Sequence, residues 1–556
     1  MKTKTLYEIA FIVMFVIALF VAVQLINDAR VSHERPVAFW ARDSFYSTQI
    51  ITDTREGNGF LKGRAPYTID YKTDSYYYRP PLFGAIGTML SHSTGLNDFD
   101  IGYHLTFFVS LIMIALIYVM LRDISPKLAM ISLPLTLLLY IWPFNAFLTA
   151  GHWPSTLNIL FVIASILVYM HLKSIKSYVL FGLMIGAGML SHTRETIYFL
   201  IFIFSLLIIY DVFKKKLTVS KMKRLLLSLG VGLVTYIGFI PYFIFTMGTQ
   251  DSLKLGYFPK TNFDTPTLFN FHWFVLLLLV AGVVCFSILL YLGKKKSHVP
   301  YIFGIGFFIM IFSNVFISIG NKAAAQNRFF LPIVLAIFFG TTTYELIRIY
   351  CNKNWCYFAA AIVFIVLILA THNFYTPTRG PVIESYYWDG LQFLADNVPE
   401  NDTVLSLFTF QLGHDAVYWW TKRNVHIVLA ELFVSDPNTM ENPIFKAKLH
   451  ARESYAVRKG LFDFEIHNPN ENLIGFSVCN YSYVLIQKNY SDLQLPTNEA
   501  WHVLNAYVTN ERNNLIRVKN MTIAYEDNWL MVLYNKNKLA CRRGIHFNET
   551  HMEEER

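Results

Sequence analysis

Long apolar runs constrain this chain more than any other feature, because each is long enough to cross a bilayer, which takes about 20 helical residues. The run from 177 to 211 is interrupted by Ser191–Glu195 and counts as two short spans, which makes about eleven in all. The predicted spans are 8–26, 102–121, 128–147, 156–172, 177–190, 196–211, 225–247, 272–292, 299–319, 329–348 and 356–372. The sequence therefore predicts a multi-pass α-helical membrane protein.

Composition and charge agree with this class. Only 15% of the residues are charged and 54% are hydrophobic, whereas soluble proteins carry about 25% charged residues. The net charge of +9 is spread in short basic clusters between the apolar runs. That distribution follows membrane topology, so we expect no nucleic-acid partner.

Orientation follows from the connections between spans. Every alternate connection carries Lys or Arg, for example 214–224 and 294–296, and basic connections face the cytoplasm. The first span is favoured as an uncleaved anchor over a signal peptide. The opposite connections are predicted to be extracytoplasmic: 27–101, 148–155, 191–195, 248–271, 320–328 and 373–556.

The last third of the chain changes composition and is predicted to be a small soluble α/β domain at 373–556, after a transmembrane domain at 1–372. Strand-like runs are Thr403–Phe410, Val425–Leu429 and Tyr483–Gln487, beside a predicted helix at Trp388–Asn397. Five glycosylation sequons favour an extracytoplasmic location, at Asn401, Asn480, Asn489, Asn520 and Asn548. Cys479 and Cys541 are the only cysteines in this region, and whether they pair is left open.

The first external segment, 27–101, concentrates the polar chemistry. Asp43 follows the first span by fewer than about twenty residues, which holds it near the lipid headgroups. Alone it would most simply be part of a solvated loop. Arg79, however, precedes two prolines that open a helix predicted at Leu82–Ser91, and a guanidinium at a helix start suits phosphate.

Three motifs, in order and on one side of the membrane, resemble GT-C fold glycosyltransferases, most of all the protein O-mannosyltransferase and aminoarabinose transferase branch. They are Asp43 after the first span, Arg79-Pro80-Pro81-Leu82 opening a juxtamembrane helix, and Asn327–Pro332 entering a late span. The segment Gly390–Pro399 also resembles the start of the soluble domain that many of these enzymes carry. The resemblance covers nearly the whole chain in architecture.

The departures from that pattern carry information too. Ser44 stands where the family has a second acid, so such a role would fall to Asp53, Glu56, Asp70 or Asp74. Arg79 replaces the usual lysine and keeps the charge. Trp419-Trp420 is followed by Thr421 and not by the acceptor motif of oligosaccharyltransferases, which makes glycan transfer to Asn the less favoured alternative.

The resemblance implies inverting transfer of a sugar from a polyprenyl (dolichyl-type) phosphate to an acceptor hydroxyl on a protein or glycan, at the extracytoplasmic face. Asp43 would be the general base, and Arg79 and Arg328 would neutralise the leaving phosphate. Further candidates, each with a plain structural alternative, are His192 and Arg194 for the phosphate and Tyr76, Tyr77 and Tyr78 for sugar stacking.

Several alternatives remain open at this level. A transporter or flippase should show repeated halves with ionisable groups at the midplane, and none is evident. The sequence neither requires nor excludes a divalent metal, because no His or Cys cluster has ligand spacing. The plasma membrane of a prokaryote is the expected location, with the endoplasmic reticulum membrane as the alternative.

Overall fold

The computed structural model describes most of the transmembrane region and part of the C-terminal region. The described residues are 3–28, 42–56, 81–140, 148, 151–213, 215–241, 331–351, 353–370, 387–399, 402–407, 420–421, 423–428, 479, 481–488, 509, 512–513, 515–517 and 519–543. The predicted spans at 272–292 and 299–319 lie outside these residues.

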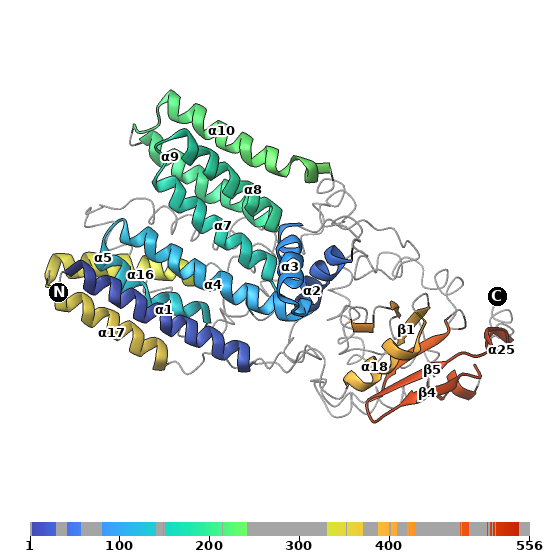
Figure 1. The fold of residues 1–556 in the computed structure, drawn as a ribbon. Coiled ribbons are helices and arrows are strands. Elements are labelled where there is room, and N and C mark those ends of the chain that lie inside the picture. The colour runs from blue at the N-terminus through green and yellow to red at the C-terminus, as the bar shows by residue number, and fades with distance from the viewer. Residues whose placement is uncertain are drawn as a thin grey trace, which may run out of the picture.

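Most helices gather in one body, and the strands lie to one side of it with α18 and α25 (Figure 1). In chain order the helical elements of the body are α1 Thr3–Asp28, α2 Arg42–Arg55, α3 Pro81–Thr94, α4 Asp98–Arg122, α5 Pro126–Ser132, η1 Pro134–Tyr140, α7 Trp153–Met170, α8 Ile175–Tyr198, η2 Phe199–Phe204, α9 Ser205–Phe213, α10 Val219–Tyr236, η3 Ile237–Phe239, α16 Leu331–Tyr350 and α17 Asn354–Ala370.

Four helical segments of the described chain are long and apolar enough to cross a membrane: Asp98–Ile124, Trp153–Met170, Ile175–Thr193 and Val219–Phe239. Three shorter apolar helical segments accompany them, at Tyr7–Val23, Pro126–Tyr140 and Asn354–Ile368. All seven coincide with predicted spans. Large apolar side chains remain exposed on several of them, such as Phe20 on α1 and Val234 on α10, each at 67%, as expected of helices whose solvent is lipid.

The interrupted run at 177–211 folds as a helical hairpin. The backbone leaves helical geometry at His192, with φ −159° and ψ 91°. Pairs placed symmetrically about this residue meet: a Cβ on Gly188 would lie 2.9 Å from Thr196 Oγ1, and the rings of Phe181 and Phe204 lie 5.4 Å apart. The chain therefore reverses direction at His192, as the two-span interpretation predicted.

Helices α8 and α10 run parallel and pack closely through small residues. The hydroxyl of Ser228 donates to the carbonyl of Tyr178 at 2.7 Å, and a Cβ on Gly182 would lie 2.3 Å from the Ser228 carbonyl oxygen. Only a glycine at position 182 allows this approach, which is the usual way in which membrane helices gain contact area.

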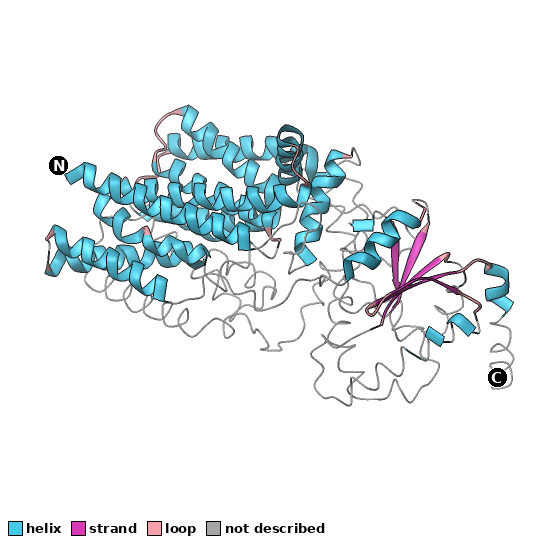
Figure 2. Cartoon of the chain, turned by 60° about the horizontal axis from the view of Figure 1, so that its bottom comes forward, coloured by secondary structure: helices cyan, strands magenta, loops and turns pink. Residues whose placement is uncertain are grey.

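The C-terminal elements form a five-stranded sheet in the order β2-β1-β3-β5-β4. Figure 2 draws the strands in magenta. β1 is parallel to β2 and β3, whereas β5 is antiparallel to β3 and β4. The elements of this region are α18 Trp388–Asn397, β1 Thr403–Leu407, β2 Asn424–Val428, β3 Tyr483–Gln487, β4 Thr522–Glu526, β5 Leu530–Tyr534 and α25 Lys538–Arg543.

The helix α18 and the first three strands agree with prediction, but the β4–β5 hairpin was not predicted. β4 is an exposed edge strand with little apolar patterning. The hairpin depends on Asp527, whose Oδ1 accepts hydrogen bonds from the backbone N–H groups of Trp529 at 2.7 Å and Leu530 at 2.6 Å. Such a side-chain-to-backbone turn leaves only a weak signal in sequence.

Two disulfides are present among the described residues. One joins Cys479 to Cys541, the pair that the sequence left open. The other joins Cys351 to Cys356 across the turn between α16 and α17, which the sequence analysis did not anticipate.

Candidate active site

Helix α2 is the central element of the candidate site, and the sequence analysis did not predict it. Its sequence is rich in Ser and Thr, which favour helices poorly. Burial compensates: Phe45, Ile50 and Ile51 are at most 2% exposed. Asp43 therefore stands in the first turn of a packed helix and not in a solvated loop.

Buried Asp98, in the first turn of α4, ties α2 to α3 and α4. Its Oδ1 accepts hydrogen bonds from Arg55 Nη1 at 2.9 Å and Ser91 Oγ at 3.0 Å, and its Oδ2 accepts one from Thr52 Oγ1 at 2.7 Å. The carboxyl side chain is only 4% exposed. Because a buried carboxylate needs such partners, this set fixes the relative positions of the three helices.

We expect Asp98→Asn to lower the free energy of unfolding by about 1.5–3 kcal/mol, the range for a hydrogen bond to a charged group. The substitution removes the charge that Arg55 meets and turns one acceptor into a donor. Thermal unfolding of the purified protein in detergent measures the loss. The matched control is Asp123→Asn, whose partner His171 is 52% exposed, and it should cost less than about 1 kcal/mol. An equal loss of unfolding free energy in the two variants would contradict the role given to Asp98.

The contact between α2 and α3 depends on two glycines of α3. A Cβ on Gly84 would lie 2.7 Å from Thr54 Oγ1, and one on Gly87 would lie 2.6 Å from Ile51 Cγ1. The two helices therefore touch backbone to side chain. In the sequence α3 begins at Pro81, directly after Arg79-Pro80. The helix that follows Arg79 is therefore packed against the helix that carries Asp43.

The start of α7 meets the same group of helices. Ser47 Oγ donates to the carbonyl of Gly151 at 2.5 Å, at a residue whose φ of +84° suits glycine. Trp153 is fully buried, donates through its indole N–H to the Leu148 carbonyl at 2.7 Å, and lies against Gly102 of α4. The buried indole therefore packs the start of α7 against α4.

The hairpin turn at His192 contributes a buried polar cluster. Asn158 Nδ2 donates to the His192 carbonyl at 3.3 Å and to Glu195 Oε2 at 3.2 Å, while Asn158 Oδ1 accepts from Thr196 Oγ1 at 3.0 Å. His192 Nδ1 lies 3.8 Å from Glu195 Oε2. The buried atoms His192 Nδ1 and Glu195 Oε1 have no hydrogen-bond partner among the residues that the structure describes.

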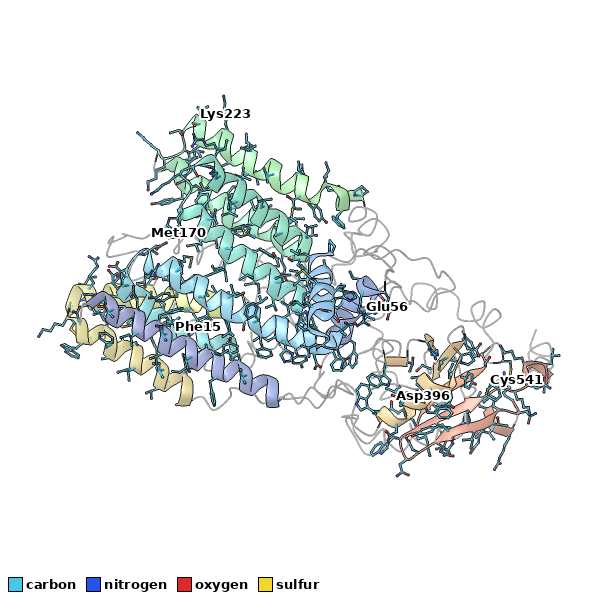
Figure 3. The ribbon with its side chains drawn as sticks, viewed as in Figure 1. Phe15, Glu56, Met170, Lys223, Asp396 and Cys541 are labelled. Atoms are coloured by element: carbon cyan, nitrogen blue, oxygen red, sulfur yellow. A yellow bond between two sulfur atoms is a disulfide. The ribbon has the colours of Figure 1, made fainter. Side chains whose placement is uncertain are left out.

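These elements define the α2 end of the helix bundle: α2, α3, the start of α7 and the turn of α8, with α3 contacting α8 as well. Figure 3 labels Glu56 at this end, whereas Met170 of α7 and Lys223 of α10 lie at the opposite end. A polar helix with buried carboxylates thus lies at one end of an apolar bundle.

The structure places part of the predicted site. Asp53 is buried on α2, and exposed Glu56 follows that helix. Arg194 follows the break at His192 in the chain trace. The other predicted residues of the site lie outside the described residues: Asp70, Asp74, Tyr76, Tyr77, Tyr78, Arg79 and Arg328. Of the predicted sequons only Asn520 is described; it is exposed, with φ +56°.

Sequence reasoning missed Asp98, Asn158 and Glu195. Asp98 lies just before the predicted span 102–121. An acidic residue near a helix N-terminus is common and does not by itself indicate a site. An acid and an amide inside apolar runs, as at Glu195 and Asn158, are the signals that could have been followed. Among the described residues, no group of three or more His, Cys, Asp or Glu side chains is placed to hold a metal ion.

Comparisons with known proteins place the fold. No protein-family model matches the chain, and no curated protein matches its sequence. The structure of ArnT from Cupriavidus metallidurans in the apo state aligns with a TM-score of 0.52 and 13% identity, covering 95% of this chain and 98% of that one. The same protein bound to undecaprenyl phosphate aligns at 0.51 and 13%, covering 94% and 98%.

An oligosaccharyltransferase from Archaeoglobus fulgidus aligns with a TM-score of 0.46 and 14% identity over 85% of this chain and 68% of that one, which is too loose to inform the fold. The ArnT likeness extends over nearly the whole of both chains and confirms the GT-C-like fold that the sequence predicted. With its apolar helices, the chain is an integral membrane protein.

Proposed function

We propose that this protein is a glycosyltransferase that moves a sugar from a polyprenyl phosphate to an acceptor hydroxyl at the extracytoplasmic membrane face. The observation that carries the proposal is the fold, which is shared with ArnT, a protein whose structure has been solved bound to undecaprenyl phosphate. The sequence motifs at Asp43, Arg79 and Arg328 support the proposal.

In the proposed reaction the acceptor oxygen attacks the anomeric carbon and the bond from that carbon to the phosphate oxygen breaks, with inversion. Asp43 takes the proton of the acceptor hydroxyl, and the polyprenyl phosphate leaves with the bonding electron pair. Asp43 lies in the first turn of a helix that is hydrogen-bonded to α4 and to Gly151, just before α7, and is packed on α3, which supports a fixed base. Such preorganisation is what general base catalysis requires.

Arg79 and Arg328 neutralise the charge that develops on the leaving phosphate. His192 and Arg194, at the turn of α8, are the further side chains assigned to this phosphate. Asp53, Glu56, Asp70 and Asp74 are the candidates for a second acid or for a metal, and Tyr76, Tyr77 and Tyr78 are assigned to the sugar ring. No step of the proposed reaction passes through a metal.

Mass spectrometry of cell-surface glycans, with and without this protein, tests the proposed function and identifies the sugar. A sugar lost from protein or envelope glycan when the protein is absent supports it. In parallel, purified protein in bilayers should release polyprenyl phosphate from a polyprenyl-phosphate sugar when an acceptor is supplied. Unchanged glycans together with no such release would refute the proposal.

The orientation of the chain has its own test. We propose that the α2 end of the bundle and the C-terminal sheet lie outside the cytoplasm, because the basic connections and the sequons favour the same orientation. The proposed membrane is the plasma membrane of a prokaryote. A reporter fused after Glu555 should be extracytoplasmic, and one at Lys295 should be cytoplasmic. If both reporters lie on the same side, the predicted topology and the proposed site of transfer fail together.

A further inference from the structure

Gln49, in the middle of α2, is a buried side chain whose polar atoms meet no partner within the described parts of the chain. The residue is 2% exposed, and neither Nε2 nor Oε1 makes a hydrogen bond to any described residue. Among the described residues it is the only side-chain amide with both polar atoms buried and unbonded. Its neighbours differ: the hydroxyls of Thr48 and Thr52 both donate hydrogen bonds.

An amide buried in this way opposes folding, because it has given up its hydrogen bonds to water without replacing them. Native proteins contain few such groups, and those that persist need an explanation, of which a functional site is a common one. A leucine of similar size would fill the same space without this cost. The presence of glutamine therefore indicates a partner that binds during function.

The position of Gln49 separates it from the residues that fasten α2. One face of the helix meets α3 through Ile51 and Thr54, and another reaches Asp98 through Thr52 and Arg55. Gln49 lies on the remaining face with Asp53, one turn further on. This face is buried as well, but the hydrogen bonds from α2 to Asp98 come from Thr52 and Arg55 and not from Gln49.

We propose that the side-chain amide of Gln49 binds a carbohydrate hydroxyl, either of the transferred sugar or of a glycan acceptor. A hydroxyl can donate to Oε1 and accept from Nε2 at adjacent ring positions, so an amide matches a pair of neighbouring sugar hydroxyls. This inference rests on the proposed function. Gln49 lies on the helix that carries Asp43, about 9 Å further along its axis and about 120° around it.

The test substitutes Gln49→Leu in the full-length protein. A ligand-binding amide predicts a combination that a structural amide does not: thermal stability equal to or above that of the wild type, with a rise of about tenfold or more in KM, or loss of transfer. Affinity for a non-hydrolysable polyprenyl-phosphate sugar falls if the hydroxyl belongs to the donor. If it belongs to the acceptor, donor affinity is unchanged and the KM for the acceptor rises.

Gln487→Leu provides the matched control. Gln487 is also a fully buried glutamine, but its Nε2 donates to the Tyr387 hydroxyl at 2.7 Å within the C-terminal sheet region. Its loss should lower the unfolding temperature and leave both KM values close to wild type.

The inference is overturned if Gln49→Leu unfolds at a lower temperature with substrate binding unchanged, or if it alters neither stability nor either KM. In both cases the wild type still transfers sugar, so the proposed function stands. A wild type that neither binds the donor nor transfers sugar overturns the proposed function and this inference with it.

Discussion

Substituting Asp43 by Asn should abolish sugar transfer while the protein still folds and binds its donor. The amide keeps the shape of the side chain but cannot take a proton from the acceptor hydroxyl. General base catalysis is worth about 10²- to 10⁴-fold, and the loss should appear in kcat. Transfer is measured as polyprenyl phosphate released by purified protein, and donor affinity with a non-hydrolysable analogue.

Asp123→Asn is the control for this experiment, because Asp123 caps the end of α4 that lies away from α2 and pairs with exposed His171. It should leave transfer close to the wild-type rate. If Asp43→Asn retains transfer within about tenfold, equivalent to roughly 1.4 kcal/mol of barrier, the base is another residue. Asp53 and Asp74 would then be the next carboxylates to replace.

Features encoded by neighbouring residues could be predicted from the sequence, whereas features that depend on contacts between distant residues could not. The helices and the reversal at His192 were predictable, because hydrophobicity and its interruption are local features of the sequence. The strand Tyr483–Gln487 and the helix Trp388–Asn397 were predictable for the same reason. Each shows the spacing of its own secondary structure without reference to the rest of the chain.

Helix α2 shows what could not be predicted. Its polar sequence resembles a loop, and it is stabilised by contacts with residues far away in the chain. Thr52 meets Asp98 across 46 positions, and Ser47 meets Gly151 across 104. Tertiary contacts of this kind override local propensity. The buried state of Gln49 has the same origin, so it too was hidden until α2 was placed.

One residue of the basic clusters also makes an ion pair that the sequence did not predict. Lys221, assigned to a cytoplasmic connection by its charge alone, pairs with the buried carboxylate of Asp211 at 2.5 Å. Asp211 also accepts a hydrogen bond from the Tyr169 hydroxyl at 2.5 Å. The ion pair joins α9 to α10, and the hydrogen bond joins α7 to α9, at the end of the bundle opposite the candidate site. Counting charges in the sequence does not reveal this structural role.

Replacing both Arg79 and Arg328 by Ala should remove most of the affinity for the lipid donor. We propose that both side chains meet one phosphate, since Arg79 lies two residues before the start of α3 and Arg328 three residues before the start of α16 in the sequence. A hydrogen bond to a charged group is worth about 1.5–3 kcal/mol, or roughly ten- to a hundredfold in affinity for each arginine. Arg79→Lys should recover part of the loss, because the charge remains but the bidentate geometry does not.

A purely structural role for Arg79 makes a different prediction. If its guanidinium only pairs with Asp70 or Asp74 to hold the first external segment, Arg79→Ala should destabilise the protein without a specific loss of lipid binding. The two roles are separated by measuring, on the same preparation, the unfolding temperature and the affinity for a non-hydrolysable polyprenyl-phosphate sugar. Unchanged donor affinity in a well-folded Arg79→Ala, Arg328→Ala double variant would rule out the proposed phosphate site, whatever the fold shares with ArnT.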